Sequence, residues 1–242
     1  MNTAMILCAG FGTRLKKYTK KIPKPMLRLS GKPLLEHTII HLSNYGICNI
    51  IINLHYFADE IISYFKDGSK WGIKITYSYE ETPLGTAGAV KNVENNLTGI
   101  DDFLVLYGDV ICNENYKDFI KFHKSKKDAV ASIILHKRNR SNSIVEMDNK
   151  SMIIRFIERP DKEIKNKNQN WVNSGLYSFN KKILNYIPQK VFCDFPKDIF
   201  PILVSEGCLY GYELKGYRCS IDSPKRYIKV QNDFKKKIFE QY

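Results

Sequence analysis

Strand-like and helix-like patterns alternate along the first half of this 242-residue chain. Residues 47–54 are a β-branched, apolar run typical of a buried strand, and residues 34–45 repeat apolar side chains at helical spacing. This alternation predicts an α/β fold in which a mixed, mostly parallel sheet carries helices on both faces. The expected strands are residues 4–7, 47–54, 74–79, 103–106 and 129–136, and the expected helices are residues 34–45, 58–65, 86–97 and 116–124.

The second half has a different pattern. We expect a hairpin of residues 143–148 and 152–158, a polar exposed loop at 161–170, strands at 172–179 and 209–214, and helices at 182–187 and 195–204. Pro224 is suited to the first position of a last helix, with Ser223 as its N-cap. Because the chain shows neither an internal repeat nor a long linker, we expect residues 1–242 to form a single domain.

Composition excludes several classes of protein. The chain has no apolar run of about 18 residues and no charged segment before its first apolar run, so neither a membrane helix nor a signal peptide is expected. Its six cysteines lack the spacing of a zinc site, which favours reduced, buried thiols and a cytoplasmic location.

The formal net charge of +13 could attract nucleic acid, acidic lipid or phosphorylated small molecules. Much of the excess comes from short lysine clusters, which are typical of a solvated surface. No recognisable nucleic-acid-binding motif accompanies the charge. An RNA-binding protein therefore remains an alternative that rests on charge alone.

A glycine-rich turn directly follows the first expected strand, in the sequence ILCAGFGTR. Glycines allow close approach of the backbone to a ligand, and successive N–H groups in such a turn can bind an anion. The spacing matches neither G-x-G-x-x-G nor a P-loop. Arg14 follows the turn at once, and Lys24 lies between Pro23 and Pro25, which we expect to hold it in a fixed, extended conformation. This combination fits a triphosphate, although an ordinary strand–helix turn with surface cations is the alternative.

The turn is one of several motifs that together resemble those of the sugar-1-phosphate nucleotidyltransferases, also called nucleotide-sugar pyrophosphorylases. The similarity looks greatest to enzymes that transfer a guanylyl group to mannose or heptose 1-phosphate. It implies a Rossmann-like, GT-A-like fold, with a nucleotide-binding half at about residues 1–136 and a sugar-phosphate-binding half at about 137–242. The motifs, in order, are LCAGFGTRL, PKPML, GKPLLE, ETPLGTAGA, LYGD, FIERP, VNSGLY and IDSPKRY.

The reaction implied by the resemblance joins an NTP to a sugar 1-phosphate and releases pyrophosphate. The resemblance makes Asp109 and Asp222 the ligands of Mg²⁺, a cation that prefers carboxylate oxygens. Taken alone, an aspartate at a strand end is more often a turn or cap residue. Ser223 occupies a position where the family more often has a small, flexible residue. The expected catalytic residues are Arg14, Lys24 and Asp109.

The remaining site residues are also implied by the resemblance. Glu80 would read the base, and its carboxylate, which only accepts hydrogen bonds, would suit guanine or cytosine better than thymine or uracil; a solvent-facing Glu80 is the alternative. Arg159 stands where the family commonly has lysine, and Ser141–Ser143 replace a common Tyr-Gly pair. The expected nucleotide-binding residues are Leu7, Ala9, Gly10, Gly12, Thr13, Arg14, Lys24, Glu80, Gly85 and Thr86. The expected sugar-phosphate-binding residues are Gly108, Glu158, Arg159 and Asn173.

The leading hypothesis is thus a cytoplasmic, Mg²⁺-dependent transferase that uses GTP and mannose or heptose 1-phosphate. Thymidylyl, uridylyl or cytidylyl transfer, including transfer to another sugar phosphate or a phosphonate, stays open. A catalytically silent regulatory homologue is a further alternative, although such proteins usually lose the loop arginine or a metal-binding aspartate. Neither nucleic acid nor a membrane is expected as a partner, and a homo-oligomer is left open.

Overall fold

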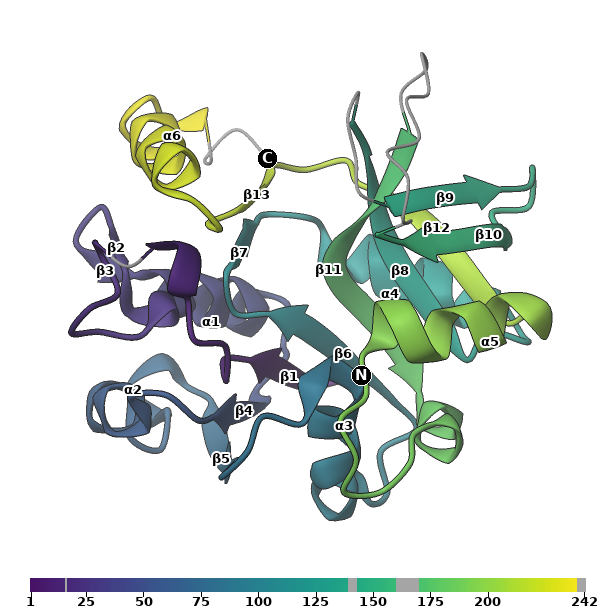
Figure 1. Cartoon of the computed structure of the whole chain (residues 1–242), viewed down its shortest axis with the longest axis horizontal. Coiled ribbons are helices and arrows are strands. Elements are labelled where there is room, and N and C mark those ends of the chain that lie inside the picture. The colour runs from purple at the N-terminus through teal and green to yellow at the C-terminus, as the bar shows by residue number, and fades with distance from the viewer. Residues whose placement is uncertain (16, 139–142, 160–169, 239–242) are drawn as a thin grey trace. The chain divides into compact units, whose positions relative to one another are not determined.

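A computed structural model describes residues 1–15, 17–138, 143–159 and 170–238 (Figure 1). The contacts within the chain group its residues into two compact units. We call Asn2–Pro83, Leu106–Tyr116 and Lys215–Tyr242 the N-terminal unit. Met1, Leu84–Val105 and Lys117–Leu214 form the central unit. These boundaries differ from the expected division near residue 136, and the single domain stays a prediction.

Three parallel strands form the centre of the N-terminal unit. β1 (Thr3–Leu7) and β5 (Lys74–Tyr79) pair with β4 (Asn49–Leu54) on either side, in a register that places Ile52 opposite both Ile6 and Tyr77. The helices α1 (Leu34–Asn44) and α2 (Ala58–Phe65) provide the connections between these strands. Strand–helix alternation is therefore confirmed here, with α2 and β5 at their expected bounds.

Short elements that the sequence patterns did not indicate complete this unit. β7 (Val110–Cys112) pairs antiparallel with β13 (Arg218–Ser220), and β2 (Arg28–Leu29) pairs antiparallel with β3 (Lys32–Pro33). Three single turns of 3₁₀ helix are η1 (Thr13–Leu15), η2 (Lys24–Met26) and η3 (Ser69–Trp71). Two or three residues are too few to show a periodicity, which is why these elements were missed.

The last helix, α6 (Pro224–Lys235), begins as expected. The Ser223 hydroxyl accepts a hydrogen bond from the Arg226 N–H at 3.4 Å, and Pro224 occupies the first turn. α6 packs through Tyr227 and Val230 on a buried cluster that also contains Leu15 and Ile111. The glycine-rich turn, β7 and α6 therefore share one hydrophobic core.

The central unit contains a second group of strands. β8 (Ala131–Arg138) pairs antiparallel with β11 (Asn170–Asn180) and parallel with β12 (Leu209–Glu213). The expected hairpin is confirmed as β9 (Ser143–Met147) and β10 (Ile153–Glu158), and it meets β11 where Val145 lies opposite Trp171. β6 (Asp102–Tyr107) begins in this unit and continues along the chain into the N-terminal unit.

Several helical segments of this unit differ from expectation. Residues 86–97 form α3 (Gly85–Asn92) and a 3₁₀ turn, η4 (Glu94–Leu97). Residues 195–204 divide into a π-helical turn, η6 (Phe195–Ile199), and α5 (Phe200–Ser205), because Pro201 has no N–H and so is tolerated only in the first turn of α5. Residues 182–187 are largely 3₁₀ rather than α, in η5 (Lys181–Tyr186), whereas α4 (Tyr116–Ser125) is close to its expected bounds.

The predicted α/β class with a mixed sheet is confirmed, although the central unit is richer in antiparallel pairs than the patterns suggested. Of the expected loop 161–170, only Asn170 lies within the described residues, where it begins β11. No helix in the described part of the chain is long and apolar enough to cross a membrane.

Candidate functional site

The glycine-rich turn has a backbone that a side chain would disturb at one position and tolerate at another. Gly12 has a φ of +62°, in the left-handed region that favours glycine, and its carbonyl accepts hydrogen bonds from the Leu15 N–H (3.0 Å) and the Thr19 hydroxyl (3.2 Å). A Cβ atom added to Gly10 would meet nothing within 4 Å. Gly12 is therefore explained by the turn itself, whereas Gly10 leaves open space beside the backbone.

Lys24 reaches the end of a neighbouring strand. Its ammonium group donates a hydrogen bond to Oδ2 of Asp109, and its side chain is only 11% exposed. The expected extended conformation of Lys24 is wrong, since it begins the 3₁₀ turn η2, whose N–H groups bond back to the Pro23 and Lys24 carbonyls. The extended conformation belongs instead to Pro23, which directly precedes the 3₁₀ turn. The fixed φ of the proline ring therefore restricts Pro23 rather than Lys24, which adopts a helical conformation.

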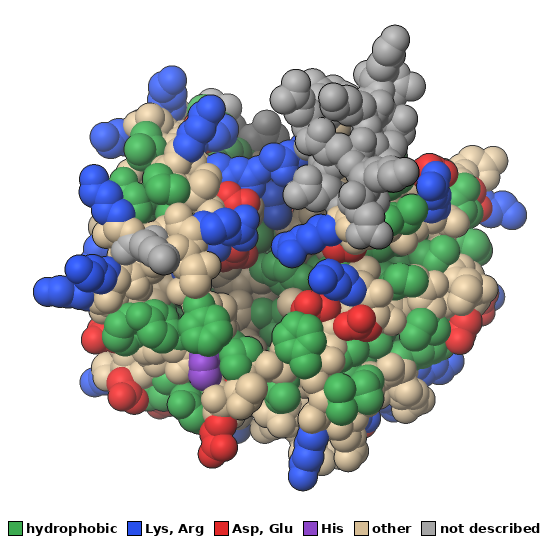
Figure 2. Space-filling view, viewed as in Figure 1, with side chains coloured by type: hydrophobic (Ala, Val, Ile, Leu, Met, Phe, Trp, Pro, Cys, Tyr) green, Lys and Arg blue, Asp and Glu red, His purple; other side chains and the backbone are tan. Residues whose placement is uncertain are grey.

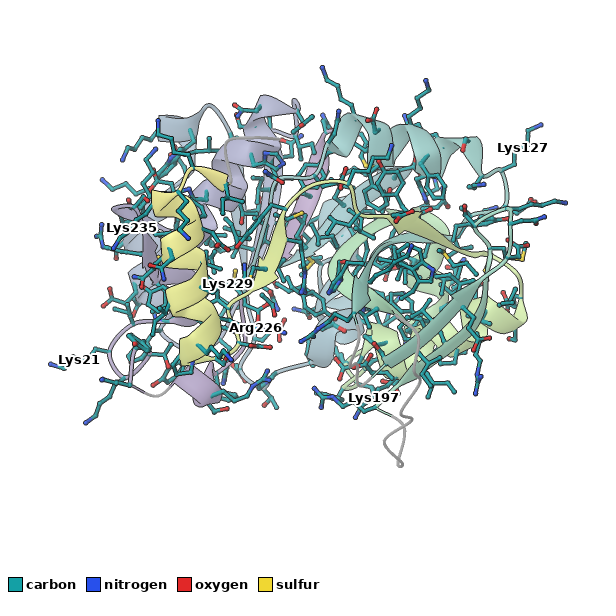
Figure 3. The ribbon with its side chains drawn as sticks, turned by 90° about the horizontal axis from the view of Figure 1, so that it is seen from above. Lys21, Lys127, Lys197, Arg226, Lys229 and Lys235 are labelled. Atoms are coloured by element: carbon teal, nitrogen blue, oxygen red, sulfur yellow. The ribbon has the colours of Figure 1, made fainter. Side chains whose placement is uncertain are left out.

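A pair of aspartates lies at the ends of the two short strands β7 and β13. Asp109 immediately precedes β7, and its carbonyl accepts a hydrogen bond of 2.8 Å from the Ile221 N–H. Asp222 follows that residue and forms an ion pair of 2.9 Å with Arg226, while the Arg14 guanidinium lies 3.9 Å from the same oxygen. Figure 3 shows Arg226 on the first turns of α6, with Lys229 and Lys235 farther along the helix. Pairing of β7 with β13 thus brings together two carboxylates that are 113 residues apart in the numbering.

These two carboxylates fit a hard divalent cation. Asp109 and Asp222 are each about a quarter exposed, at 27% and 25%, and the ion pairs to Lys24 and Arg226 both end on Oδ2. Mg²⁺ is usually held by one or two carboxylates and completes its shell with phosphate oxygens and water. Within the residues that the structure describes, no cluster of three or more His, Cys, Asp or Glu side chains forms a closed protein site. The donor set therefore suits a cation that two protein carboxylates hold in part and whose coordination shell is completed by phosphate oxygens and water.

Two arginines near these carboxylates were not singled out from the sequence. Burial lowers the pKa of Arg218 on β13, and the charge of Asp109 opposes that effect. Arg226 donates to the Ser220 hydroxyl (2.7 Å) as well as to Asp222. Its position in IDSPKRY, four residues after Asp222 at the start of a helix, is the signal that could have identified it.

Glu80 is buried at the end of β5, with 3% of its surface exposed, so the solvent-facing alternative is wrong. Its Oε1 accepts a hydrogen bond of 2.8 Å from the Asn53 amide, and the Asn53 carbonyl oxygen accepts one of 2.7 Å from the Cys8 N–H. This chain of hydrogen bonds joins the carboxyl ends of β1, β4 and β5. It fixes the Glu80 side chain near the glycine-rich turn.

Leu7 and Gly108 meet at the end of β1. The Gly108 N–H donates to the Leu7 carbonyl at 2.9 Å, and a Cβ at Gly108 would lie 2.5 Å from the Cys8 sulfur and 2.8 Å from the Leu7 carbonyl oxygen. Gly108 is therefore required by packing, independently of any ligand. Ala9 continues the chain from Cys8 into the turn, and Thr13 is the first residue of η1.

The central unit holds the other expected nucleotide-binding residues. Gly85 has a φ of +76°, and an added Cβ would lie 2.5 Å from the Cys193 carbonyl oxygen. The Thr86 N–H and hydroxyl both donate to Asp194 at 3.0 Å, so that carboxylate caps the first turn of α3. Gly85 and Thr86 thus have roles within the fold that the sequence could not show.

The expected sugar-binding residues also lie in the central unit. Burial raises the pKa of Glu158, against the charges of Arg159 and Lys197, and the Arg159 Nε lies 3.8 Å from its carboxylate. The Asn173 amide donates to the Tyr177 hydroxyl (2.8 Å), and its oxygen accepts from the Gly175 N–H (3.0 Å), where β11 leaves its regular register with β8. Of the Ser141–Ser143 segment, only Ser143 lies within the described residues.

The N-terminal unit therefore brings together most of the expected nucleotide and metal residues. Arg14, Lys24, Asp109 and Asp222 are joined by ion pairs, and Glu80 is tied to β1 through Asn53. Gly85, Thr86, Glu158, Arg159 and Asn173 belong to the central unit. Their assignment to a nucleotide or a sugar phosphate stays a prediction, as does that of the residues in the N-terminal unit.

Comparisons with curated proteins support the sequence resemblance. Mannose-1-phosphate guanyltransferase beta-A of Xenopus laevis is 34% identical over 229 residues, and mannose-1-phosphate guanyltransferase of Saccharomyces cerevisiae is 33% identical over 229 residues. Each alignment covers 93% of this chain and 62% of the relative. The chain thus spans a little under two thirds of the length of these relatives.

Comparisons with solved structures support the same family resemblance. HddC from Yersinia pseudotuberculosis superposes with a TM-score of 0.81 at 31% identity, covering 97% of this chain and all of that one. The same protein complexed with GMP-PN superposes with a TM-score of 0.80. The model of the nucleotidyl transferase family matches residues 3–237. With these matches and the ion-paired turn, the chain belongs to the nucleotidyl transferase family, as its motifs indicated.

Proposed function

We propose that this protein transfers a guanylyl group from GTP to a sugar 1-phosphate, giving a nucleotide sugar and pyrophosphate. The observation that carries the proposal is the set of ion pairs in the N-terminal unit, in which Lys24 and Arg14 meet Asp109 and Asp222 beside the glycine-rich turn. Cations that can neutralise a triphosphate and carboxylates that can hold its metal are thus in direct contact. The names of the relatives, and a family neighbour complexed with GMP-PN, point to the same reaction.

In this reaction, an oxygen of the sugar phosphate attacks the α-phosphorus of GTP, a new P–O bond forms, and the bond to the departing pyrophosphate breaks. The protein needs to orient the reactants and neutralise developing negative charge. The N–H groups of the turn and the Arg14 and Lys24 cations would bind the phosphate chain. Asp109 and Asp222 would hold Mg²⁺, which supplies Lewis-acid stabilisation of the phosphate oxygens.

Glu80 supports the choice of guanine. One carboxylate oxygen is occupied by the Asn53 amide, which fixes the direction of the group. A carboxylate only accepts hydrogen bonds, and guanine presents two adjacent donors on its pairing edge. Replacement by Glu80→Gln would introduce a donor and should reduce discrimination between guanine and other bases.

The sugar is proposed as mannose or heptose 1-phosphate. The first rests on the names of the curated relatives, and the second on the resemblance of the motifs. Free thiols at all six cysteines support action in the reducing cytoplasm.

The direct test measures pyrophosphate release with Mg²⁺ over a grid of the common NTPs and a panel of sugar 1-phosphates. Activity with GTP and one of the two sugars supports the proposal, and the Asp109→Asn variant should abolish it. Activity only with another NTP would overturn the guanylyl assignment. A folded chain that binds GTP but turns over none of the sugar phosphates would favour a different acceptor, and one that binds no NTP would favour the catalytically silent homologue.

A further inference from the structure

A pocket of about 560 Å³ lies on the N-terminal unit, beside the glycine-rich turn. Such a volume falls within the range of small-molecule sites. None of the side chains assigned above to the metal or the base lines it, and two of its lining residues, Phe11 and Thr13, belong to the glycine-rich turn. The lining residues are Phe11, Thr13, Lys17, Thr19, Lys20 and Tyr56.

Two aromatic rings form one wall of this pocket. The Phe11 ring is 50% exposed and meets His55 edge-on, with ring centroids 5.0 Å apart. The centroid of the Tyr56 ring lies 6.0 Å from that of Phe11, and the two ring planes are tilted by 52°. This spacing leaves no room for a ring between Phe11 and Tyr56, so a flat ligand would stack on their accessible faces. An aromatic ring held in this exposed position provides a platform for such a ligand.

Cations form the other part of the pocket. The segment from Gly10 to Leu35 contains no acidic residue, and its cations are Arg14, Lys16, Lys17, Lys20, Lys21, Lys24, Arg28 and Lys32. Lys24 is paired with Asp109, but Lys17 and Lys20 are exposed side chains that line the pocket. On the face shown in Figure 2, hydrophobic side chains of this unit lie close to Lys and Arg side chains. An aromatic wall beside ammonium groups is complementary to a ligand with a flat ring and a phosphate.

We propose that this pocket is a second nucleotide site, distinct from the one formed by Lys24, Asp109 and Asp222. The base of a nucleoside diphosphate would stack on Phe11 and Tyr56, and its phosphates would meet Lys17 and Lys20. Stacking accepts any base, because every base has a π face, so the site binds adenine and guanine nucleotides alike.

Occupation of the pocket would act on the phosphate-binding turn. The Thr19 hydroxyl, in the pocket wall, donates to the carbonyl of Gly12, and Thr13 belongs to both the wall and the turn. A ligand that holds this wall in place therefore limits movement of the turn. This coupling gives the second site a means to change the affinity of the first.

The test is the binding of ADP to the full chain, measured by isothermal titration calorimetry at low salt. Tyr56→Ala should weaken ADP binding about tenfold or more, as expected for the loss of one base–aromatic contact. The double variant Lys17→Ser/Lys20→Ser should weaken it to a similar extent, and it changes only exposed side chains. The control is Lys21→Ser, since Lys21 points away from the ribbon (Figure 3) and does not line the pocket; its affinity should stay within about twofold of wild type.

Lys24→Ala separates this inference from the proposed function. It should leave ADP binding intact while reducing binding of GTP at the first site. GDP should bind to wild type at two sites and to the lysine double variant at one. The inference is overturned if ADP does not bind. It is also overturned if the affinity for ADP is the same in the pocket variants as in wild type and is lost in Lys24→Ala. If ADP binds as expected but no guanylyl transfer is detected, the second nucleotide site is supported and the proposed function is refuted.

Discussion

The ammonium group of Lys24 and the carboxylate of Asp109 form an ion pair, although the two residues are separated by 85 positions in the chain. Both side chains are mostly shielded from water, with exposures of 11% and 27%. Such a pair is screened less than one on the open surface. In the proposed reaction, Lys24 would bind phosphate and Asp109 would bind the metal, so this pair would hold both groups in place before either ligand binds.

Replacement of this lysine should therefore affect chemistry more than folding. For Lys24→Ala we expect turnover to fall about a hundredfold or more, because a fixed cation that stabilises developing charge is removed. The measurement is kcat from pyrophosphate release, together with the urea midpoint of unfolding. Lys181→Ala is the matched control, since Lys181 forms an exposed pair with Asp101 at 2.7 Å that should contribute little. Equal activity of the two variants would contradict a catalytic role for Lys24.

A variant of Arg14 tests separately the proposed role of the glycine-rich turn in binding phosphate. The Arg14 side chain is 71% exposed, and its distance of 3.9 Å from Asp222 is long for an ion pair. Arg14→Ala should therefore leave the free energy of unfolding within about 0.5 kcal/mol of wild type. Turnover should nevertheless fall about a hundredfold or more, because the guanidinium fork for phosphate is lost. Arg28→Ala is the comparison, since the Arg28 side chain is exposed and its guanidinium donates to the nearby Gly31 carbonyl at 2.6 Å. Near-wild-type turnover of Arg14→Ala would refute its assignment.

Gly85 shows how a motif glycine can serve the fold. Gly85→Ala would place a methyl carbon 2.5 Å from the Cys193 carbonyl oxygen and would strain a φ of +76°. We expect a loss of at least about 3 kcal/mol in the free energy of unfolding, the sum of clash and backbone strain. Gly99→Ala is the control with the same sign of φ (+78°) and open space, and it should lose about 1 kcal/mol. Similar losses in urea unfolding for both variants would show that the Cys193 contact is unimportant.

The sequence predicted some of the longer elements correctly, although the expected helices at 86–97 and 195–204 are each divided in two. α2 and β5 have the bounds that periodicity indicated, and Ser223 caps α6 as expected. β7 and β13 were missed because three residues carry no period, yet their pairing is what sets Asp109 beside Asp222.

Contacts between residues that are distant in the sequence could not be predicted either. The motifs identified Lys24, Asp109 and Gly85, but not that Lys24 binds Asp109 or that Gly85 packs on Cys193. These contacts depend on tertiary packing, for which a single sequence supplies no partner. The Asp222–Arg226 pair was within reach, because a spacing of four residues at a capped helix start brings such side chains together.

The pH dependence of stability should report the burial of Glu158. Burial raises the pKa of its carboxyl group above the ordinary value of 4.5, so the folded state binds the proton more tightly than the unfolded state. Stability contributed by the protonated form is fully present below pH 4.5 and is lost as the pH rises through the folded-state pKa. Glu158→Gln, which cannot ionise, should therefore gain stability relative to wild type between pH 4 and pH 7, as measured by urea unfolding at each pH. Glu146→Gln is the matched control, because Glu146 is 48% exposed in a surface pair with Arg155. A constant difference between Glu158→Gln and wild type over this range would mean that the Glu158 carboxyl titrates alike in both states.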